Sequence, residues 1–409
     1  MRPTHLTIQP AVQGQAISAP RQLDAPLVIG AVVFWVVFPG FYFYHFMISQ
    51  GLANPLLGGL FGPALVAAFP FLIWAAVVAF RRQGRVGFPA ILSLFIWLVA
   101  WASLWMAINF AARPQDPAHE QLATTLLLWV PLFMLSMVTP LYSDGFRNVL
   151  WISWIVILAL AVSAVDASLL MAVGTVEEAA SYQGLARSLM VTSSLLVAST
   201  DRKVMRWALA GVSIFGLFLI GARSELYGFL VAYVFTEFLL NKRSVFGRGL
   251  FVGLLALGAA LVARNLNILG SSRQLEILDL SESTSWLARE YMQQVALSQI
   301  VDNPILGAYG GHWVSGEGDY AHNALSVWVS LGLPGFVLYC ALCVAATLAA
   351  VRALLRSPMS RVAQLATLMN VSTVLLVVLA KPLFWEMAAF AWGLGMMAAL
   401  EQRGRLAAS

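Results

Sequence analysis

Apolar runs of about 20 residues recur along the whole chain, and this pattern decides the class of fold. A helix of that length crosses a hydrocarbon core of roughly 30 Å. The mean hydropathy of +0.81 and the 60% share of hydrophobic residues lie far outside the range of soluble domains. The short alternating segments of a spanning β-barrel are missing from the sequence. The sequence therefore predicts an all-α, polytopic bundle of transmembrane helices.

Twelve segments have the composition of membrane spans and divide the chain into predicted regions. These are a cytoplasmic tail (1–26), nine spans (27–264), a long outer loop (265–322) and three spans with a short C-terminal tail (323–409). The tail lacks the apolar region and cleavage site of a signal peptide. The predicted spans are 27–48, 60–80, 88–110, 122–140, 149–166, 188–200, 205–220, 226–240, 249–264, 323–350, 362–380 and 383–400.

Most basic residues fall in alternate loops, which predicts an orientation with both termini in the cytoplasm. The net charge of +5 then reflects membrane topology and not nucleic-acid binding. Seven basic residues remain for the outer face: Arg113, Arg187, Arg223, Arg264, Arg273, Arg289 and Lys381. For Glu225, Asp166 and Glu386, pairing with Arg223 or Lys381 would be an ordinary structural role. Cys340 and Cys343 lie in an apolar run, where packing is favoured over redox chemistry.

The long outer loop is predicted to contain an amphipathic helix. Ser283 or Ser285 can cap its start, and Asn303-Pro304 ends it because the residue before proline disfavours helix. Its apolar positions repeat at helical spacing: Trp286, Leu287, Tyr291, Met292, Val295, Ala296 and Ile300.

Polar residues gather between Asn303 and Gly335, at the mouth of a predicted span, where ionisable groups tend to be functional. His322 is the best acid–base candidate, because an imidazole can accept a proton at neutral pH. A lone histidine at a membrane boundary is more often an interfacial or capping residue. A metal site with His312, Glu317 and Asp319 is a weaker alternative, since their spacing matches no compact ligand motif. The glycine-rich part before His322 is interpreted as a flexible approach.

Three outer arginines could bind a phosphate group. Arg187, Arg223 and Arg289 each lie near a membrane boundary or on the loop helix. Snorkelling toward lipid phosphates explains any single one of them. Together they could clamp a diphosphate, because guanidinium groups bind phosphate oxygens in a bidentate manner and stay charged.

The order of these elements resembles the signature of the O-antigen ligase and O-antigen polymerase superfamily. That signature has an arginine on a loop helix, a Pro-x-x-Gly segment, a His-Asn pair that opens a membrane helix, and a Gly-x-x-Gly. The matching residues are Arg289, Pro304, Gly307, His322, Asn323, Gly332 and Gly335. The family's further arginine turn corresponds to Arg223, although Ser224 replaces the glycine that often follows. The resemblance covers roughly residues 180–340.

The resemblance implies a bacterial inner-membrane glycosyltransferase that acts at the periplasmic face without a cofactor or metal. Its donor would be a glycan on undecaprenyl diphosphate, and a glycan hydroxyl would be the acceptor. By the same analogy, His322 would be the general base, and Arg223 and Arg289, with Arg187 as a weaker third, would hold the diphosphate. Besides the lipid bilayer, flippase and chain-length regulator proteins would be possible partners.

The sequence leaves several functions open. A polymerase of O-antigen, capsule or exopolysaccharide repeat units is slightly favoured over an O-antigen ligase, because more pathways need polymerases. Another class of lipid-sugar transferase is disfavoured, because the first outer segment (49–59) has no acidic residue. A lipid-glycan transporter would favour inverted repeats or a ladder of buried charges, and neither is visible.

Overall fold

The computed structural model describes residues 24–54, 60–82, 89–163, 176–241, 284–311 and 321–408, and the regular elements in these ranges are helices. The all-α prediction is confirmed for these residues. The elements are α1 (Ala25–Trp35), η1 (Val36–Gly40), α2 (Phe41–Ser49), α3 (Phe61–Arg82), α4 (Ala90–Ala112), α5 (Ala118–Val138), α6 (Asp144–Ser163), α8 (Val176–Ser199), α9 (Lys203–Ile220), α10 (Arg223–Leu240), α13 (Thr284–Asp302), α14 (Leu325–Arg356), α15 (Arg361–Leu379) and α16 (Met387–Ala408).

Eight segments among the described residues are long and apolar enough to cross a membrane, and each overlaps a predicted span. Three other predicted spans are the more polar helices α8, α10 and α16. The predicted span 249–264 lies outside the described residues, so the total of twelve stays a prediction. The eight segments are Ala25–Ile48, Phe61–Arg82, Ala90–Ala112, Ala118–Val138, Asp144–Ser163, Lys203–Ile220, Leu325–Arg356 and Arg361–Leu379.

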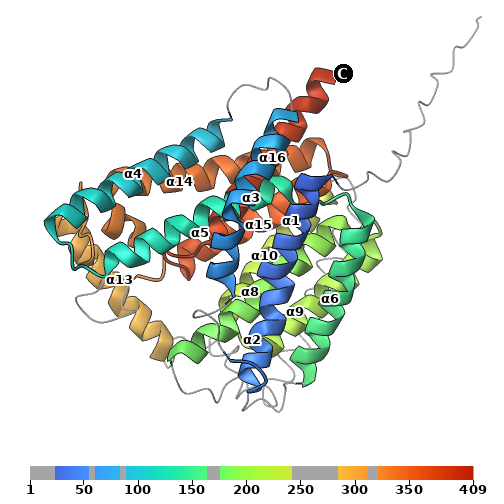
Figure 1. The fold of residues 1–409 in the computed structure, drawn as a ribbon, viewed down its shortest axis with the longest axis horizontal. Coiled ribbons are helices and arrows are strands. Elements are labelled where there is room, and N and C mark those ends of the chain that lie inside the picture. Colours follow the sequence, from blue (N-terminus) through green and yellow to red (C-terminus); the bar gives the residue numbers. More distant parts are fainter. Residues whose placement is uncertain are drawn as a thin grey trace, which may run out of the picture.

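The helices pack around α16, which contacts α5, α14 and α15 near the centre of the bundle (Figure 1). Aromatic side chains fill this contact. Trp392 of α16 lies edge-on to Trp129 of α5 and Tyr339 of α14, with ring centroids 5.5 and 5.1 Å apart. Edge-to-face pairs of this kind add to the stabilisation from burial. The core therefore joins helices from both ends of the sequence. Cys343 is buried in this core as a free thiol.

The predicted loop helix exists as α13, and it ends at Asp302, directly before Asn303-Pro304. It lies at one edge of the bundle against α14 (Figure 1). Ala296 and Ile300 bury against Val329 of α14, as the apolar periodicity predicts. Leu287 and Tyr291, near its start, are exposed.

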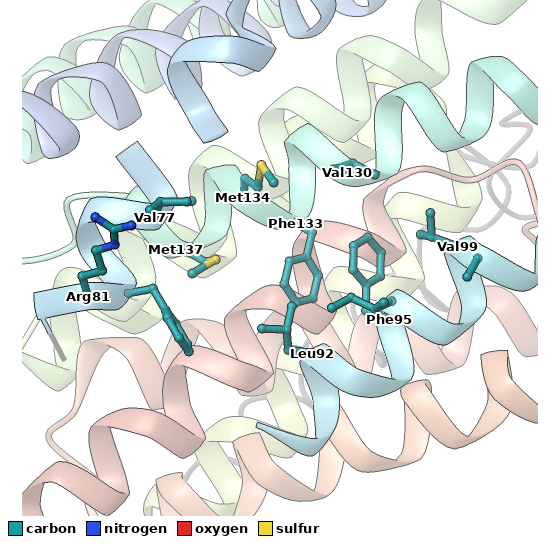
Figure 2. A pocket seen from close by; sticks show the side chains of 13 residues that line it. Val77, Arg81, Leu92, Phe95, Val99, Val130, Phe133, Met134 and Met137 are labelled. Atoms are coloured by element: carbon teal, nitrogen blue, oxygen red, sulfur yellow. The ribbon is translucent and has the colours of Figure 1, made fainter. Parts of the chain in front are cut away.

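An apolar groove of about 550 Å³ runs between α3, α4 and α5 (Figure 2). Phe95, Phe133 and Met134 are among the residues that line it, and Arg81 lies at one end. An apolar groove on a membrane helix bundle suits a lipid chain better than a reaction, and its described lining offers no proton acceptor.

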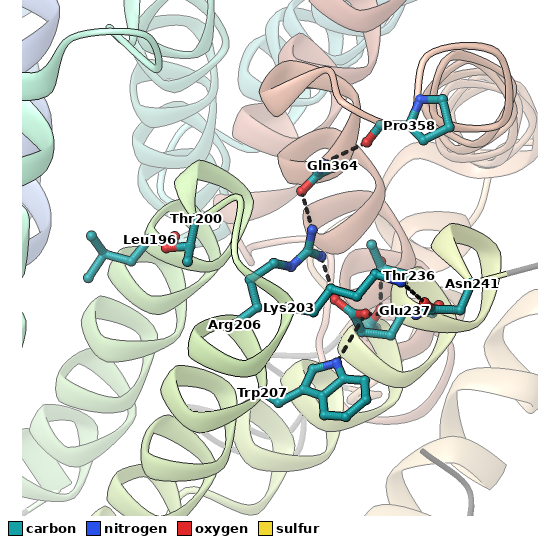
Figure 3. Close-up of polar contacts among 11 residues, drawn as sticks. Leu196, Thr200, Lys203, Arg206, Trp207, Thr236, Glu237, Asn241, Pro358 and Gln364 are labelled. Atoms are coloured by element: carbon teal, nitrogen blue, oxygen red, sulfur yellow. Dashed lines mark hydrogen bonds and ion pairs between the residues drawn. The ribbon is translucent and has the colours of Figure 1, made fainter. Parts of the chain in front are cut away.

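A set of buried polar contacts joins α9, α10 and α15 (Figure 3). Arg206 pairs with Glu237 at 2.5 Å and donates to the Gln364 side chain at 2.9 Å. Trp207 and Asn241 also donate to the Glu237 carboxylate. We call these five residues the Arg206 network. Buried charges require such partners, because a charge that loses its hydration is otherwise strongly unfavourable.

Candidate functional site

His322 and Arg289 line the same pocket, which has a volume of about 200 Å³. Arg289 lies on α13, and His322 lies in the turn before α14. The remaining lining comes from Glu290, Gln293, Asn323 and Leu379. The structure thus places the candidate base next to a candidate phosphate ligand from another segment of the chain.

The environment of His322 keeps its imidazole neutral. Burial is the main cause that lowers its pKa from 6.5 to about 4, and the positive charges of Arg289 and Lys381 lower it further. A positive charge nearby and a loss of hydration both disfavour the protonated ring. At neutral pH the ring therefore has a nitrogen lone pair that can accept a proton.

Asn323 fixes the backbone at His322. Its side-chain oxygen accepts a hydrogen bond from the backbone N–H of Leu325 at 3.0 Å, at the start of α14. Its amide lies 3.3 Å from the side-chain oxygen of Gln293 on α13. Asn323 therefore joins α13 to α14 directly beside the candidate base. An asparagine at this position can hold the backbone that carries His322.

The Pro-x-x-Gly and Gly-x-x-Gly segments dock against each other. Ala308 donates its N–H to the Val329 carbonyl at 2.8 Å, and Leu333 donates to the Ile305 carbonyl at 2.9 Å. Both Gly307 and Gly332 have a positive φ, and a Cβ on either would come within 2.6 Å of a carbonyl oxygen across this contact. Only glycine permits that backbone and that approach without strain.

For residues 303–311 this contact corrects the interpretation of a flexible approach, while residues 312–320 of the glycine-rich segment lie outside the described residues. The indole of Trp328 donates to the Pro304 carbonyl at 2.8 Å, and Gln299 of α13 donates to the Gly311 carbonyl at 2.9 Å. Residues 303–311 are therefore a packed brace between α13 and α14. His312, Glu317 and Asp319, the other members of the weaker metal alternative, lie outside the described residues.

The brace meets α14 at a kink. Gly332 is the non-helical residue of this helix, and Pro334 lacks the N–H that would continue the ladder. The carbonyl of Leu331 accepts a hydrogen bond from the indole of Trp101 on α4 at 2.8 Å. Gly335 lies against the same indole, so a Cβ there would be only 3.1 Å from it. The kink thus ties the start of α14 to α4.

Arg223 is the first residue of α10, after a turn in which Gly221 has a φ of 87°. A glycine in this conformation is a common end of a helix. Arg223 is not among the described residues that line the pocket of His322. Two residues further along α10, the carboxylate of Glu225 pairs with Lys381.

Two ion pairs here consist of buried or nearly buried charges: Lys381 with Glu225, and Arg187 with Glu386. We call these four residues the four-charge cluster. Lys381 pairs with Glu225 at 2.6 Å, one of the structural roles considered from the sequence. Arg187 pairs with Glu386, and its guanidinium lies 3.9 Å from the ring centroid of Phe61. A cation over an aromatic face is stabilised by the ring. Arg187 therefore lies in the cluster and not in the pocket.

Lys381 is the residue that sequence reasoning undervalued. The sequence identifies it as an outer basic residue, but its link to the residues around His322 depends on the turn between α15 and α16, which no motif marks. Glu290 and Gln293 were likewise overlooked as pocket residues, although their spacing of three from one another on a helix puts them on one face with Arg289.

Residues 208–340 match a family model described as O-antigen ligase. The match is shorter than half of the chain, and it runs from α9 into α14, across Arg223, Arg289 and His322. No curated protein matches the chain. Together with the membrane helices, the match confirms the expected family. The chain is an integral membrane protein whose residues 208–340 are similar to the O-antigen ligase family, as the sequence motifs predict.

Proposed function

We propose that the protein is a glycosyltransferase that takes a glycan from undecaprenyl diphosphate and transfers it to a hydroxyl of a second glycan. The observation that carries the proposal is the shared pocket of a neutral histidine and an arginine. One group can accept the proton of the acceptor, and the other can bind the leaving diphosphate.

In the proposed step, the acceptor oxygen forms a bond to the anomeric carbon of the donor sugar. The bond from that carbon to the diphosphate breaks, and the lipid diphosphate leaves with the electron pair. The acceptor proton moves to the imidazole of His322. Arg289 and Arg223 stabilise the charge that grows on the diphosphate, which is the principal way in which such a site lowers a barrier.

The bound donor also strengthens the base. A diphosphate at Arg289 offsets the positive charge that now lowers the pKa of His322. The imidazolium that forms during transfer is then balanced by the leaving group. The site therefore suits a reaction in which a proton acceptor and an anionic leaving group act together.

We place the reaction at the periplasmic face of a bacterial inner membrane, with both termini in the cytoplasm. The proposed product is a polymer of O-antigen, capsule or exopolysaccharide repeat units. An O-antigen ligase, which transfers polymer to lipid A core, is the second candidate, because the matched family is described by that activity. Flippase and chain-length regulator proteins are the proposed partners.

The proposal is tested with the purified protein, a lipid-diphosphate-linked donor and a glycan acceptor. His322→Ala is expected to lower the transfer rate by about 10²–10⁴-fold, the usual contribution of a general base. His45→Ala is the matched control, because His45 lies on α2 and is not among the described residues that line this pocket. Normal transfer by His322→Ala would exclude the assigned base. EDTA is expected to leave the rate unchanged.

A deletion strain separates the two candidate activities. Single repeat units on lipid A, seen by gel, would indicate that a polymerase has been lost. Complete polymer retained on the lipid carrier would indicate that a ligase has been lost.

A further inference from the structure

Lys381 lies on the turn between α15 and α16 and reaches the start of α10. Its ammonium is 2.6 Å from a carboxylate oxygen of Glu225 and 3.2 Å from the side-chain oxygen of Gln183. The Lys381 and Glu225 side chains are only 8% and 1% exposed. The position of the ammonium is therefore fixed from two helices, α8 and α10.

The same turn is also fixed to the residues around His322. The backbone N–H of Leu383 donates to the hydroxyl of Ser326 at 2.7 Å. That hydroxyl donates to the carbonyl of Asn323 at 2.8 Å. A continuous path of hydrogen bonds thus runs from the turn that carries Lys381 to the residue next to His322.

We propose that Lys381 is a positioning residue for His322: Glu225 and Gln183 hold its ammonium on the turn that is hydrogen-bonded to the backbone beside His322, so that a fixed positive charge acts on the imidazole. This role rests on the proposed function, because it concerns the same base. Lys381 does not itself contact the reacting atoms in this proposal.

The charges around His322 support the assignment. Burial, Arg289 and Lys381, in that order, lower the pKa of His322, and Glu225 is not among the causes. Lys381 also lies on the turn that is hydrogen-bonded to Ser326 and, through it, to Asn323 beside His322. From α13, Glu290 also lines the pocket and has the opposite charge. Arg289 and Glu290 are the charged residues in the described lining of this pocket.

A buried ion pair is a costly way to hold two helices together, because desolvation offsets much of the attraction. An apolar pair of similar volume would join α10 to the turn at least as well. A fixed positive charge near His322 is a property that an apolar pair cannot supply. This difference separates the proposed role from simple packing.

The role predicts a coupling between donor binding and proton transfer. Without donor, two cations repel a proton from His322. A bound diphosphate neutralises that repulsion, so the ring accepts the acceptor proton only when a leaving group is present. The proton then passes to water after the products depart.

The test is the pH dependence of kcat/KM, which reports ionisation in the free enzyme. Lys381→Met removes the cation, so the acid limb of the profile is expected to move upward by about 0.5–1 pH unit. Glu225→Gln is the matched control, because it breaks the same ion pair but retains the ammonium. Its acid limb is expected at or below that of the unchanged protein.

A double variant, Lys381→Met with Glu225→Met, keeps the experiment decisive if a single variant does not fold. It leaves no unpaired charge, and its acid limb is expected to move upward like that of Lys381→Met. An acid limb that stays in place in every folded Lys381 variant would overturn the positioning role. Absence of transfer by the unchanged protein would instead refute the proposed function, so the two failures are distinguishable.

Discussion

The helix α10 carries a buried ion pair at each end, and the two pairs differ in their surroundings. Glu225 pairs with Lys381 near its start, and Glu237 pairs with Arg206 near its end. Twelve residues separate the two glutamates, which corresponds to about 18 Å along a helix. Arg206 and Glu237 are enclosed by side chains that donate or accept hydrogen bonds (Figure 3). Lys381 instead lies on a turn that is hydrogen-bonded to the residues beside His322, which lines a pocket.

This difference shows that a buried charge alone does not identify a functional site in a membrane protein. Both pairs satisfy the requirement that buried charges have partners. Only the pair at the start of α10 lies beside a titratable group that a ligand could reach. We therefore expect the Arg206 network to determine stability and the His322 pocket to determine activity.

The largest expected effect tests the stability half of this comparison. Glu237→Leu leaves Arg206 buried without its counterion and should lower the free energy of unfolding by about 3–5 kcal/mol. Activity per folded molecule should not change. Unfolding in mixed detergent, followed by tryptophan fluorescence, measures the first quantity, and the transfer assay measures the second.

The matched control removes both charges, as Arg206→Met with Glu237→Leu. Because no unpaired charge remains, most of the lost stability should return. A double variant as unstable as the single one would show that the network stabilises by shape and not by charge.

The next effect concerns the backbone near the pocket. Gly332→Ala should lower the free energy of unfolding by at least about 2 kcal/mol, because its φ is positive and a Cβ would meet the Ile305 carbonyl. Gly211→Ala is the control, since a Cβ there meets nothing within 4 Å and alanine favours helix. Equal effects of the two variants would contradict the packed brace.

A smaller effect is expected at the pocket itself. Arg289→Lys should reduce transfer at least about tenfold, because lysine cannot form a bidentate contact with a diphosphate. The free energy of unfolding should change by less than about 0.5 kcal/mol, because lysine keeps the positive charge and most of the apolar stem. Arg113→Lys, at an exposed position on the same predicted face, should leave both quantities unchanged. Unimpaired transfer by Arg289→Lys would show that Arg289 is an interfacial residue and does not bind the diphosphate.

The smallest expected effect is a pH dependence of stability. The pKa of His322 is about 4 in the folded protein, below its ordinary value of 6.5. As the pH falls from 6.5 to 4, the unfolded chain binds a proton that the folded chain does not, so stability decreases across this window. His322→Gln should remove that part of the dependence. Unfolding measured at pH 7, 5.5 and 4.5 would reveal it, and identical slopes for both proteins would argue against a buried, neutral ring.

Much of the fold follows from local pattern. Apolar runs of membrane length predict eight described spans, and helical spacing before Asn303-Pro304 predicts α13. The order of the motifs also predicts that Arg289 and His322 belong to the same site, and both line one pocket. These features depend on residues near each other in sequence, or on an order that the family shares.

The remaining features depend on contacts that sequence does not encode locally. Lys381 reaches Glu225 across the bundle, and no spacing rule links those positions. Gly307 illustrates a different limit. A glycine serves equally for a flexible segment and for a close backbone contact, because both require the absence of a Cβ. Only the structure distinguishes them.

The brace between α13 and α14 has a consequence for hydrogen–deuterium exchange. Ala308 belongs to no helix, yet its amide is donated to the Val329 carbonyl inside the packed bundle. An amide held this way exchanges only when that part of the protein opens. Deuterium uptake at Ala308 should thus be as slow as in α14. Faster uptake at this amide would report the separation of α13 from the bundle.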